Sequence, residues 1–163
     1  MPAPASVGSG LSTTLSVRPI TAADEPFLRT IFLAGRPELS LLPAALIELQ
    51  LTAQRRQYDQ QFPGNVDHVI ERGEPVGRCW TWRAATEHRL LDLVVLDIYR
   101  GQGIGRSVLA MLAEAAEQQQ LPLRLSVWPT NDIALRLYRA AGFEQYDEQN
   151  GYLLMQRLPG DPV

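Results

Sequence analysis

The sequence predicts one domain of the α/β (α+β) class, in which a mixed sheet carries helices on both faces. Two observations predict it. Residues 66–84 show the strand and turn signals of a hairpin, and two later strands are each followed by a helical pattern, as in crossover connections. The predicted order is β-α-α-β-β-β-α-β-α-β-β, which excludes a purely doubly wound sheet. With 163 residues, the chain can bury one sizeable core.

The chain is expected to begin with a mobile tail that precedes the domain. Residues 1–14 are rich in Pro, Gly, Ser and Thr, which disfavours a packed core, and the domain is expected over residues 15–158. A short strand at 15–18 comes first. Thr21 can cap a helix that runs to Ala34, and acidic residues in its first turn support that start.

A second helix and a hairpin are expected in the middle of the chain. Apolar residues recur at helical spacing on a helix that extends towards Tyr58, namely Leu42, Leu46, Leu49 and Ala53. Strands are expected at 66–72 and 76–84, on either side of a Gly-Glu-Pro turn. Residues 90–96 are nearly all apolar, which is the pattern of a strand buried on both faces.

The last third begins with a turn that contains three glycines. One face of the following helix is marked by Ile104, Val108, Leu112 and Ala115. A strand at 122–128 and a helix at 130–141 come next, and Gly142 stands where helices often end in a left-handed residue. Two final strands are expected, at 143–147 and 152–157.

Composition and charge exclude several classes of protein. The net charge is −3 and no Lys/Arg-rich run occurs, so no nucleic-acid partner is expected. The single cysteine, Cys79, excludes an internal disulfide and a Cys-based zinc site, and its apolar surroundings favour a buried thiol over a nucleophile.

No metal, membrane or secretory signal is expected either. His68 and His88 have no partner at metal-ligand spacing and are expected to be solvated or at a strand edge. No stretch approaches the ~20 apolar residues of a membrane span, and the N-terminus lacks the layout of a secretory signal. A reducing, cytoplasmic setting is therefore expected.

The glycine turn has the features of a phosphate-binding loop. Glycines let the backbone approach an anion, and the helix that follows presents unpaired N–H groups to it. The turn lacks the Gly-Lys-Ser/Thr end of a P-loop, and Arg106 stands where a Rossmann fingerprint needs its third glycine. A tight turn that binds no ligand is the alternative.

Two motifs identify a family. Arg100, Gly103 and Gly105 match Arg/Gln-x-x-Gly-x-Gly/Ala, which resembles the pyrophosphate loop of the GCN5-related N-acetyltransferase (GNAT) superfamily. Residues 131–143 resemble the later motif of the same superfamily, Asn-x-x-Ala-x-x-Leu-Tyr-x-x-x-Gly-Phe, at every named position. The resemblance covers residues 15–157. It implies a mostly antiparallel sheet of six to seven strands, an acetyl-CoA cosubstrate and no metal.

The resemblance implies where coenzyme A binds. Arg100 begins the loop motif, and the residues implied to bind the pyrophosphate are Gly101, Gln102, Gly103, Ile104, Gly105 and Arg106. Leu93, Val94 and Val95 match the family's splayed strand, whose free backbone groups hold the pantetheine arm. Asn131 is implied to contact the coenzyme, although an Asn at this position is also a good helix N-cap.

The catalytic residues implied by the resemblance are Tyr138 and Asp92. The Tyr138 phenol would protonate the leaving thiolate, or stabilise it by a hydrogen bond; the alternative is a core tyrosine. Asp92 is the first candidate for accepting the proton of the amine, ahead of Glu87 and Asp97, and it could equally be a structural carboxylate. Asp97 departs from the proline that is frequent in the family.

The implied activity is direct transfer of an acetyl group to a primary amine of a small molecule, a peptide or a protein lysine. Ser126 replaces the glutamate used by the branch that acetylates ribosomal-protein N-termini, which weakens that assignment. A non-catalytic acyl-CoA-binding or sensing module on the same fold is the alternative. The resemblance also allows a homodimer.

Overall fold

The computed structural model describes residues 14–161, which form a sheet of seven strands in the spatial order β1-β2-β3-β4-β5-β7-β6. β4 and β5 run parallel, and the other neighbouring strands are antiparallel. The strands are β1 (Ser16–Pro19), β2 (Val66–Glu71), β3 (Pro75–Arg83), β4 (His88–Val95), β5 (Leu123–Val127), β6 (Glu144–Gln149) and β7 (Tyr152–Arg157). The mixed, mostly antiparallel sheet expected from the sequence is confirmed.

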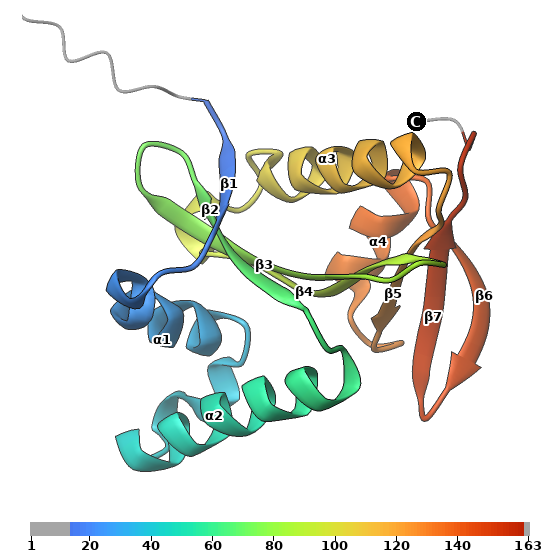
Figure 1. Ribbon diagram of the computed structural model, residues 1–163. Coiled ribbons are helices and arrows are strands. Elements are labelled where there is room, and N and C mark those ends of the chain that lie inside the picture. Colours follow the sequence, from blue (N-terminus) through green and yellow to red (C-terminus); the bar gives the residue numbers. More distant parts are fainter. Residues whose placement is uncertain (1–13, 162–163) are drawn as a thin grey trace, which may run out of the picture.

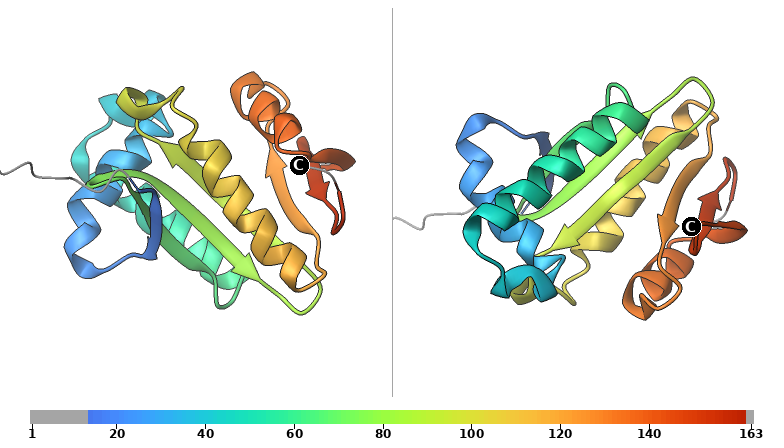
Figure 2. Two further views of the ribbon diagram at one scale, coloured as in Figure 1. Left: turned by 90° about the horizontal axis from the view of Figure 1, so that it is seen from above. Right: turned by 90° about the horizontal axis from the view of Figure 1, so that it is seen from below.

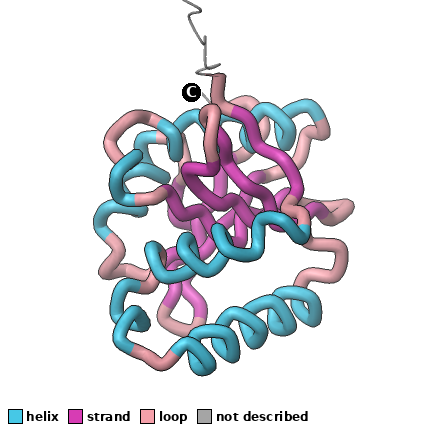
Figure 3. The backbone as a smooth tube through the Cα atoms, turned by 90° about the vertical axis from the view of Figure 1, so that its left-hand side faces the viewer, coloured by secondary structure: helices cyan, strands magenta, loops and turns pink. Residues whose placement is uncertain are grey.

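Helices cover both faces of this sheet. The α-helices are α1 (Glu25–Ala34), α2 (Ala44–Gln61), α3 (Ile104–Gln118) and α4 (Asp132–Ala140). α1 and α2 lie on one face, and α3 and α4 lie on the other (Figures 1 and 2). Figure 3 shows from another side that the strands lie between these helices. Short 3₁₀ turns precede α1, α2 and α3, at Ala22–Asp24, Pro37–Leu41 and Asp97–Tyr99.

The two faces of the sheet have separate apolar contacts. The larger core lies under α3 and α4, where Val108 and Leu109 pack with Leu135 and with the strand residue Leu125. On the other face, a small cluster joins Phe32 of α1 to Ile47 and Leu51 of α2. Because this second cluster is small, α2 is held to the sheet partly by polar and aromatic contacts.

The face that α2 buries differs from the one its apolar spacing suggests. Ile47 and Leu51 are buried, whereas Leu46 and Leu49 are 45% and 62% exposed. Apolar residues occur on more than one side of this helix, so spacing alone does not identify the buried side. The buried side is the one that contacts Phe32 of α1.

Two expectations about burial are wrong. His88 is buried, with Nε2 3.1 Å from Oε1 of Gln119, rather than solvated. Residues 90–96 are not buried on both faces, because all of them after Leu90 are half-buried. The buried Cys79 is confirmed, and burial raises the pKa of its thiol to about 12.

The expected tail, residues 1–14, falls outside the described residues except for Thr14. Within residues 14–161, no helix is long and apolar enough to cross a membrane. The same part of the chain holds no group of three or more His, Cys, Asp or Glu side chains placed to bind a metal ion.

Strand β4 contains the irregularity that shapes the site. Leu90 pairs with Thr81 and Asp92 pairs with Trp80, so Leu91 is an extra residue opposite β3. Such a bulge bends the strand and increases its twist. Towards β5, the parallel pairing covers His88–Leu90 and Leu123–Leu125 and then stops. Beyond Leu90 the two strands diverge (Figure 2, right).

Candidate active site

The divergence of β4 and β5 leaves a backbone edge open in the middle of the sheet. Leu93, Val94 and Val95 are paired with β3 on one side, but no β5 residue pairs with them on the other. Free N–H and C=O groups on a strand edge can bind an extended chain as an additional strand. The residues that the sequence singled out for the pantetheine arm therefore lie on an open edge.

The glycine loop leads from this edge to the N-terminus of α3. Gly101 and Gly103 have φ of +72° and +78°, and nothing lies within 4 Å of the position where a Cβ would be built on either. The first bond of the helix runs from the Ser107 N–H to the Gly103 carbonyl, 3.0 Å apart. The three N–H groups before it have no intrahelical acceptor. The loop therefore has the form of an anion cradle.

Gly105 has a different role from the other two glycines. A Cβ built on it would lie 3.2 Å from Cδ2 of Leu137, a residue of α4. Gly105 therefore allows α3 and α4 to pack closely. This contact places the loop motif and the Asn131–Phe143 motif side by side.

Arg100 and Gln102 brace the loop. Arg100 Nε donates to the Val95 carbonyl at 3.0 Å, and its Nη1 forms an ion pair with Asp97 at 2.8 Å. Gln102 accepts a hydrogen bond from Arg72 of the β2–β3 turn and donates to the Ile98 carbonyl. Arg106 is exposed beside the open glycines. Asp97, which replaces the family's usual proline, thus helps to hold Arg100.

Asn131 caps α4. Its Oδ1 accepts a hydrogen bond from the Ala134 N–H at 3.1 Å. The capping role that the sequence left open is therefore observed, and the side chain remains exposed at the N-terminus of α4. Its contact with the coenzyme remains a prediction.

Tyr138 lies in the core beneath the divergence of the strands. It is 8% exposed, and its ring centroid is 5.9 Å from that of Phe143. Burial raises the pKa of its phenol, and the negative charge of Asp92 raises it further. Tyr138 is therefore a protonated phenol at neutral pH, able to donate a hydrogen bond or a proton.

Asp92 follows the bulge, and its carboxylate is withdrawn from solvent. Oδ2 is buried and has no hydrogen-bond partner among the described residues. Burial raises the pKa of this carboxyl, and the positive charges of Arg78 and Arg36 oppose that rise. A carboxylate of raised pKa is a better proton acceptor than an exposed one. The negative charge of Asp92 is close enough to raise the pKa of the Tyr138 phenol.

The other two carboxylates considered as bases are placed differently. Glu87 is held by Arg89 at 3.0 Å and by Arg124 at 2.8 Å. Burial raises its pKa, but these hydrogen bonds outweigh burial and lower it overall. Asp97 is exposed and ion-paired with Arg100. Asp92 is the one of the three with a buried, unpartnered oxygen atom.

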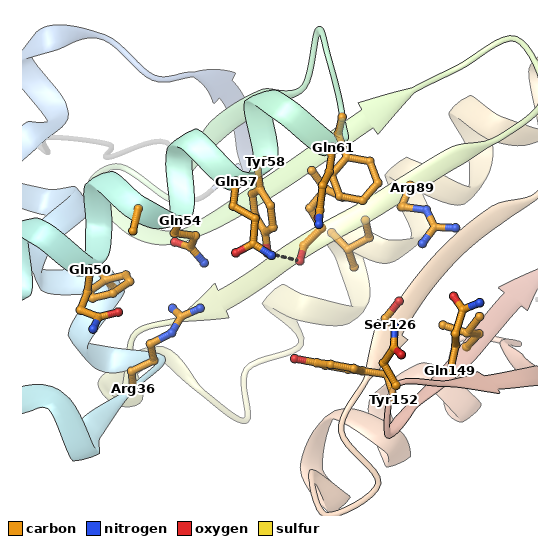
Figure 4. A pocket seen from close by; sticks show the side chains of 17 residues that line it. Arg36, Gln50, Gln54, Gln57, Tyr58, Gln61, Arg89, Ser126, Gln149 and Tyr152 are labelled. Carbon is orange, nitrogen blue, oxygen red and sulfur yellow. Dashed lines mark hydrogen bonds between the residues drawn. The ribbon is translucent and has the colours of Figure 1, made fainter.

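A cavity of about 560 Å³ opens on the α2 side of the bulge. α2 and the Phe32–Arg36 region line one side, and Leu91, Ser126 and Tyr152 line the other (Figure 4). Its volume is typical of a site for a small molecule. Because Leu91 belongs to the bulge, the cavity ends next to the open edge of β4.

The family resemblance also led us to expect an acceptor site shaped by residues 22–58 and the closing strands, and this cavity lies between those elements. Sequence reasoning did not identify most of its individual lining residues. Tyr58 of α2 donates a hydrogen bond to the Leu91 carbonyl at 3.2 Å and packs edge-on against Trp80, with ring centroids 4.6 Å apart. α2 also directs glutamines into the cavity: Gln50, Gln54, Gln57 and Gln61. Their spacing of four, three and four residues was visible in the sequence as one polar helix face.

The chain matches known acetyltransferases. Residues 65–145 match the family model described as the acetyltransferase (GNAT) domain. A thialysine N-epsilon-acetyltransferase of Bos taurus is 35% identical over 92 residues, covering 49% of this chain and 54% of the relative. This chain therefore spans about half the length of the curated relatives it matches.

Solved structures share the whole fold. The PaiA N-acetyltransferase of Thermoplasma acidophilum, crystallised with coenzyme A, has a TM-score of 0.68 at 15% identity and covers 89% of this chain and 99% of that one. A spermidine N-acetyltransferase of Vibrio cholerae, crystallised with CoA and spermine, has a TM-score of 0.66 at 16% identity, covering 90% and 96%. At these identities the likeness concerns the fold.

Proposed function

The chain belongs to the GNAT acetyltransferase superfamily, and on that premise we propose that it is an acetyl-CoA-dependent N-acetyltransferase acting on a primary amine. The domain that carries this activity spans residues 15–158. One observation carries the proposal: Tyr138 lies in the core that contains Leu93 and Val95 of the open β4 edge, and that edge begins beside a cavity of small-molecule size.

The open loop and strand edge fit coenzyme A. The unpaired N–H groups at the start of α3 and the space beside Gly101 and Gly103 suit a pyrophosphate, which Arg106 would also contact. The edge at Leu93–Val95 suits the amide-containing pantetheine arm. When bound, the coenzyme supplies the acetyl group as a thioester.

Two residues of the chain accept and donate the protons that the acetyl transfer requires. The amine nitrogen forms a bond to the acetyl carbon, and the carbon–sulfur bond breaks. Asp92 accepts, through a water molecule, the proton that the amine gives up, and Tyr138 protonates the departing thiolate or stabilises it by a hydrogen bond. One proton is taken up and one is released, so the products are an N-acetyl amine and the free thiol. No acyl-enzyme is needed.

The names of the relatives support an amine acceptor. The bovine relative is named for acetylating thialysine, and the Vibrio structure is named for acetylating spermidine. Because this chain spans about half of the bovine relative, its own acceptor is not carried over from that name.

The test is acetylation by the purified chain. We expect thiol release from acetyl-CoA in the presence of an amine panel containing thialysine, spermidine, diamines, amino acids and a lysine peptide, together with a mass increase on one amine. Binding of acetyl-CoA without acetylation of any amine would instead establish the non-catalytic acyl-CoA module.

A further inference from the structure

The acceptor cavity is polar but contains no negative charge. Its seventeen lining residues include no Asp or Glu. The glutamines of α2 are neutral groups that both donate and accept hydrogen bonds. An acceptor with several positive charges would find no carboxylate in this lining to pair with them, so the cavity is poorly suited to a polyamine.

The charged residues of the lining are two arginines, and they differ in their partners. Arg89 is paired with Glu87 at 3.0 Å. Arg36 has no carboxylate within ion-pair distance among residues 14–161, and its guanidinium lies 4.7 Å from the ring centroid of Phe32. Figure 4 shows Arg36 pointing into the cavity from the end opposite Arg89. The charge of Arg36 lowers the pKa of Asp92, but Arg36 forms no ion pair within residues 14–161, so its guanidinium is available to an anion.

Arg36 is positioned to bind an anion. Phe32 is 3% exposed, so the ring under the guanidinium is a fixed surface. Stacking uses the face of the guanidinium and leaves the N–H groups along its edges available. A guanidinium binds a planar carboxylate with two parallel hydrogen bonds, and one positive charge is balanced by one carboxylate.

The same cavity holds a buried hydrogen-bond acceptor without a donor. Oε1 of Gln54 is buried and has no partner among the described residues. Gln54 and Tyr58 are neighbours on one face of α2, and Tyr58 reaches the Leu91 carbonyl at the bulge. An unpaired acceptor near the bulge suits the N–H of an amine, whereas Arg36 suits an anion.

We propose that the acceptor is a small amino carboxylic acid, whose carboxylate binds Arg36 and whose reacting amine lies beside Gln54 and the bulge at Leu91. This inference rests on the proposed function and specifies its substrate class.

The test compares amines that differ only by the carboxylate: L-lysine with cadaverine, and L-ornithine with putrescine. We expect kcat/KM to be about tenfold or more higher for the amino acid of the reactive pair, as befits one charge-assisted hydrogen-bonded contact. Because the charge of Arg36 also lowers the pKa of Asp92, the rates are compared at a pH where Asp92 is ionised in both proteins. There, Arg36→Gln should remove this preference by lowering kcat/KM for the amino acid and leaving the diamine nearly unchanged. Arg36→Lys should restore part of it.

The control is Arg56→Gln. Arg56 is an exposed arginine of α2 that does not line the cavity and forms no ion pair within residues 14–161. This variant should keep the full preference for the carboxylate. Acetyl-CoA binding by each variant shows that the fold is intact.

The outcomes distinguish failure of the amino-acid inference from failure of the proposed N-acetyltransferase activity. Equal or better acetylation of the diamines, of spermidine or of a lysine peptide with an amidated C-terminus would overturn the amino-acid inference and leave the N-acetyltransferase standing. An equal loss for both members of a pair in Arg36→Gln would also overturn it. Acetyl-CoA binding without acetylation of any amine would overturn the proposed function and, with it, the inference.

Discussion

Arg78 and Asp92 lie on the paired strands β3 and β4, and each has one buried polar atom, Nη1 and Oδ2, without a partner among the described residues. Arg78 is also ion-paired with Asp67, with Nη2 and Oδ2 2.6 Å apart. Its charge is therefore shared between two carboxylates. Arg78 opposes the rise in the pKa of Asp92 that burial causes, but burial prevails.

Asp92→Asn should remove the proton acceptor. We expect kcat to fall by about 100-fold or more, as general bases typically contribute. In the wild type, activity should be lost as the pH falls through the pKa of Asp92, which is raised above the usual ~4 of an aspartate. The rate measured against pH tests both statements. Asp97→Asn, which removes an exposed carboxylate paired with Arg100, should keep the pH profile of the wild type.

The pKa of Asp92 that this pH profile measures depends on the groups around its carboxylate. The groups that interact electrostatically with Asp92 are Arg78, Arg36, Asp67, Tyr58, Tyr138 and Cys79. The pKa of Asp92 is higher in the folded protein than in the unfolded chain. At any pH above its value in the unfolded chain, the ionisation of Asp92 therefore lowers the free energy of unfolding. Asp92→Asn should therefore not lower Tm at pH 7. A marked fall in Tm would show that Asp92 is a structural carboxylate.

Tyr138→Phe should lower kcat by about 10- to 100-fold and leave the KM for acetyl-CoA nearly unchanged, because the hydroxyl is assigned to the leaving thiolate. Packing against Phe143 needs only the ring, so Tm should change little. Steady-state kinetics and a thermal melt check these expectations. Full activity in Tyr138→Phe would assign this residue to the core alone.

Gly103→Ala should weaken binding of coenzyme A. A φ of +78° is strained for alanine, and the loop would relax away from its open form at a cost of about 1 kcal/mol. Gly64→Ala is the matched control, because Gly64 has a φ of +80°, is equally open and lies far along the chain from the loop. Both variants should lose similar stability, but only Gly103→Ala should raise the Kd for coenzyme A in calorimetry.

Asp67→Asn should destabilise the fold and shift the pH profile together. Breaking a buried ion pair costs about 3–5 kcal/mol, which lowers Tm by roughly 10 °C in a chain of this size. The negative charge of Asp67 also raises the pKa of Asp92, so its loss should move the acidic limb of activity to lower pH. Glu48→Gln, in the exposed pair with Arg29, should do neither.

The sequence was informative where a residue has a local reason for its position. Gly103 and Gly142 adopt positive φ as their motifs require, and Asn131 caps α4. Strand and helix periodicity likewise placed each element to within a few residues. These signals depend on neighbours along the chain, so they can be recognised without knowledge of the fold.

The parts that could not be predicted depend on contacts between distant segments. The bulge at Leu91 is defined only by the register of β4 against β3. The buried side of α2 depends on Phe32, and the approach of Leu137 explains Gly105. The cavity joins α2 to the end of β5 and to β7, so its individual lining residues became recognisable only in three dimensions.

The short pairing between β4 and β5 has a mechanical consequence. Only three residue pairs, from His88–Leu123 to Leu90–Leu125, join the two halves of the sheet within residues 14–161. The two halves of the sheet are therefore joined by a short stretch of strand pairing. A ligand bound along β4 would supply the missing backbone hydrogen bonds, so coenzyme binding should slow amide hydrogen exchange at 93–95. It should also reduce the motion of one half of the sheet relative to the other.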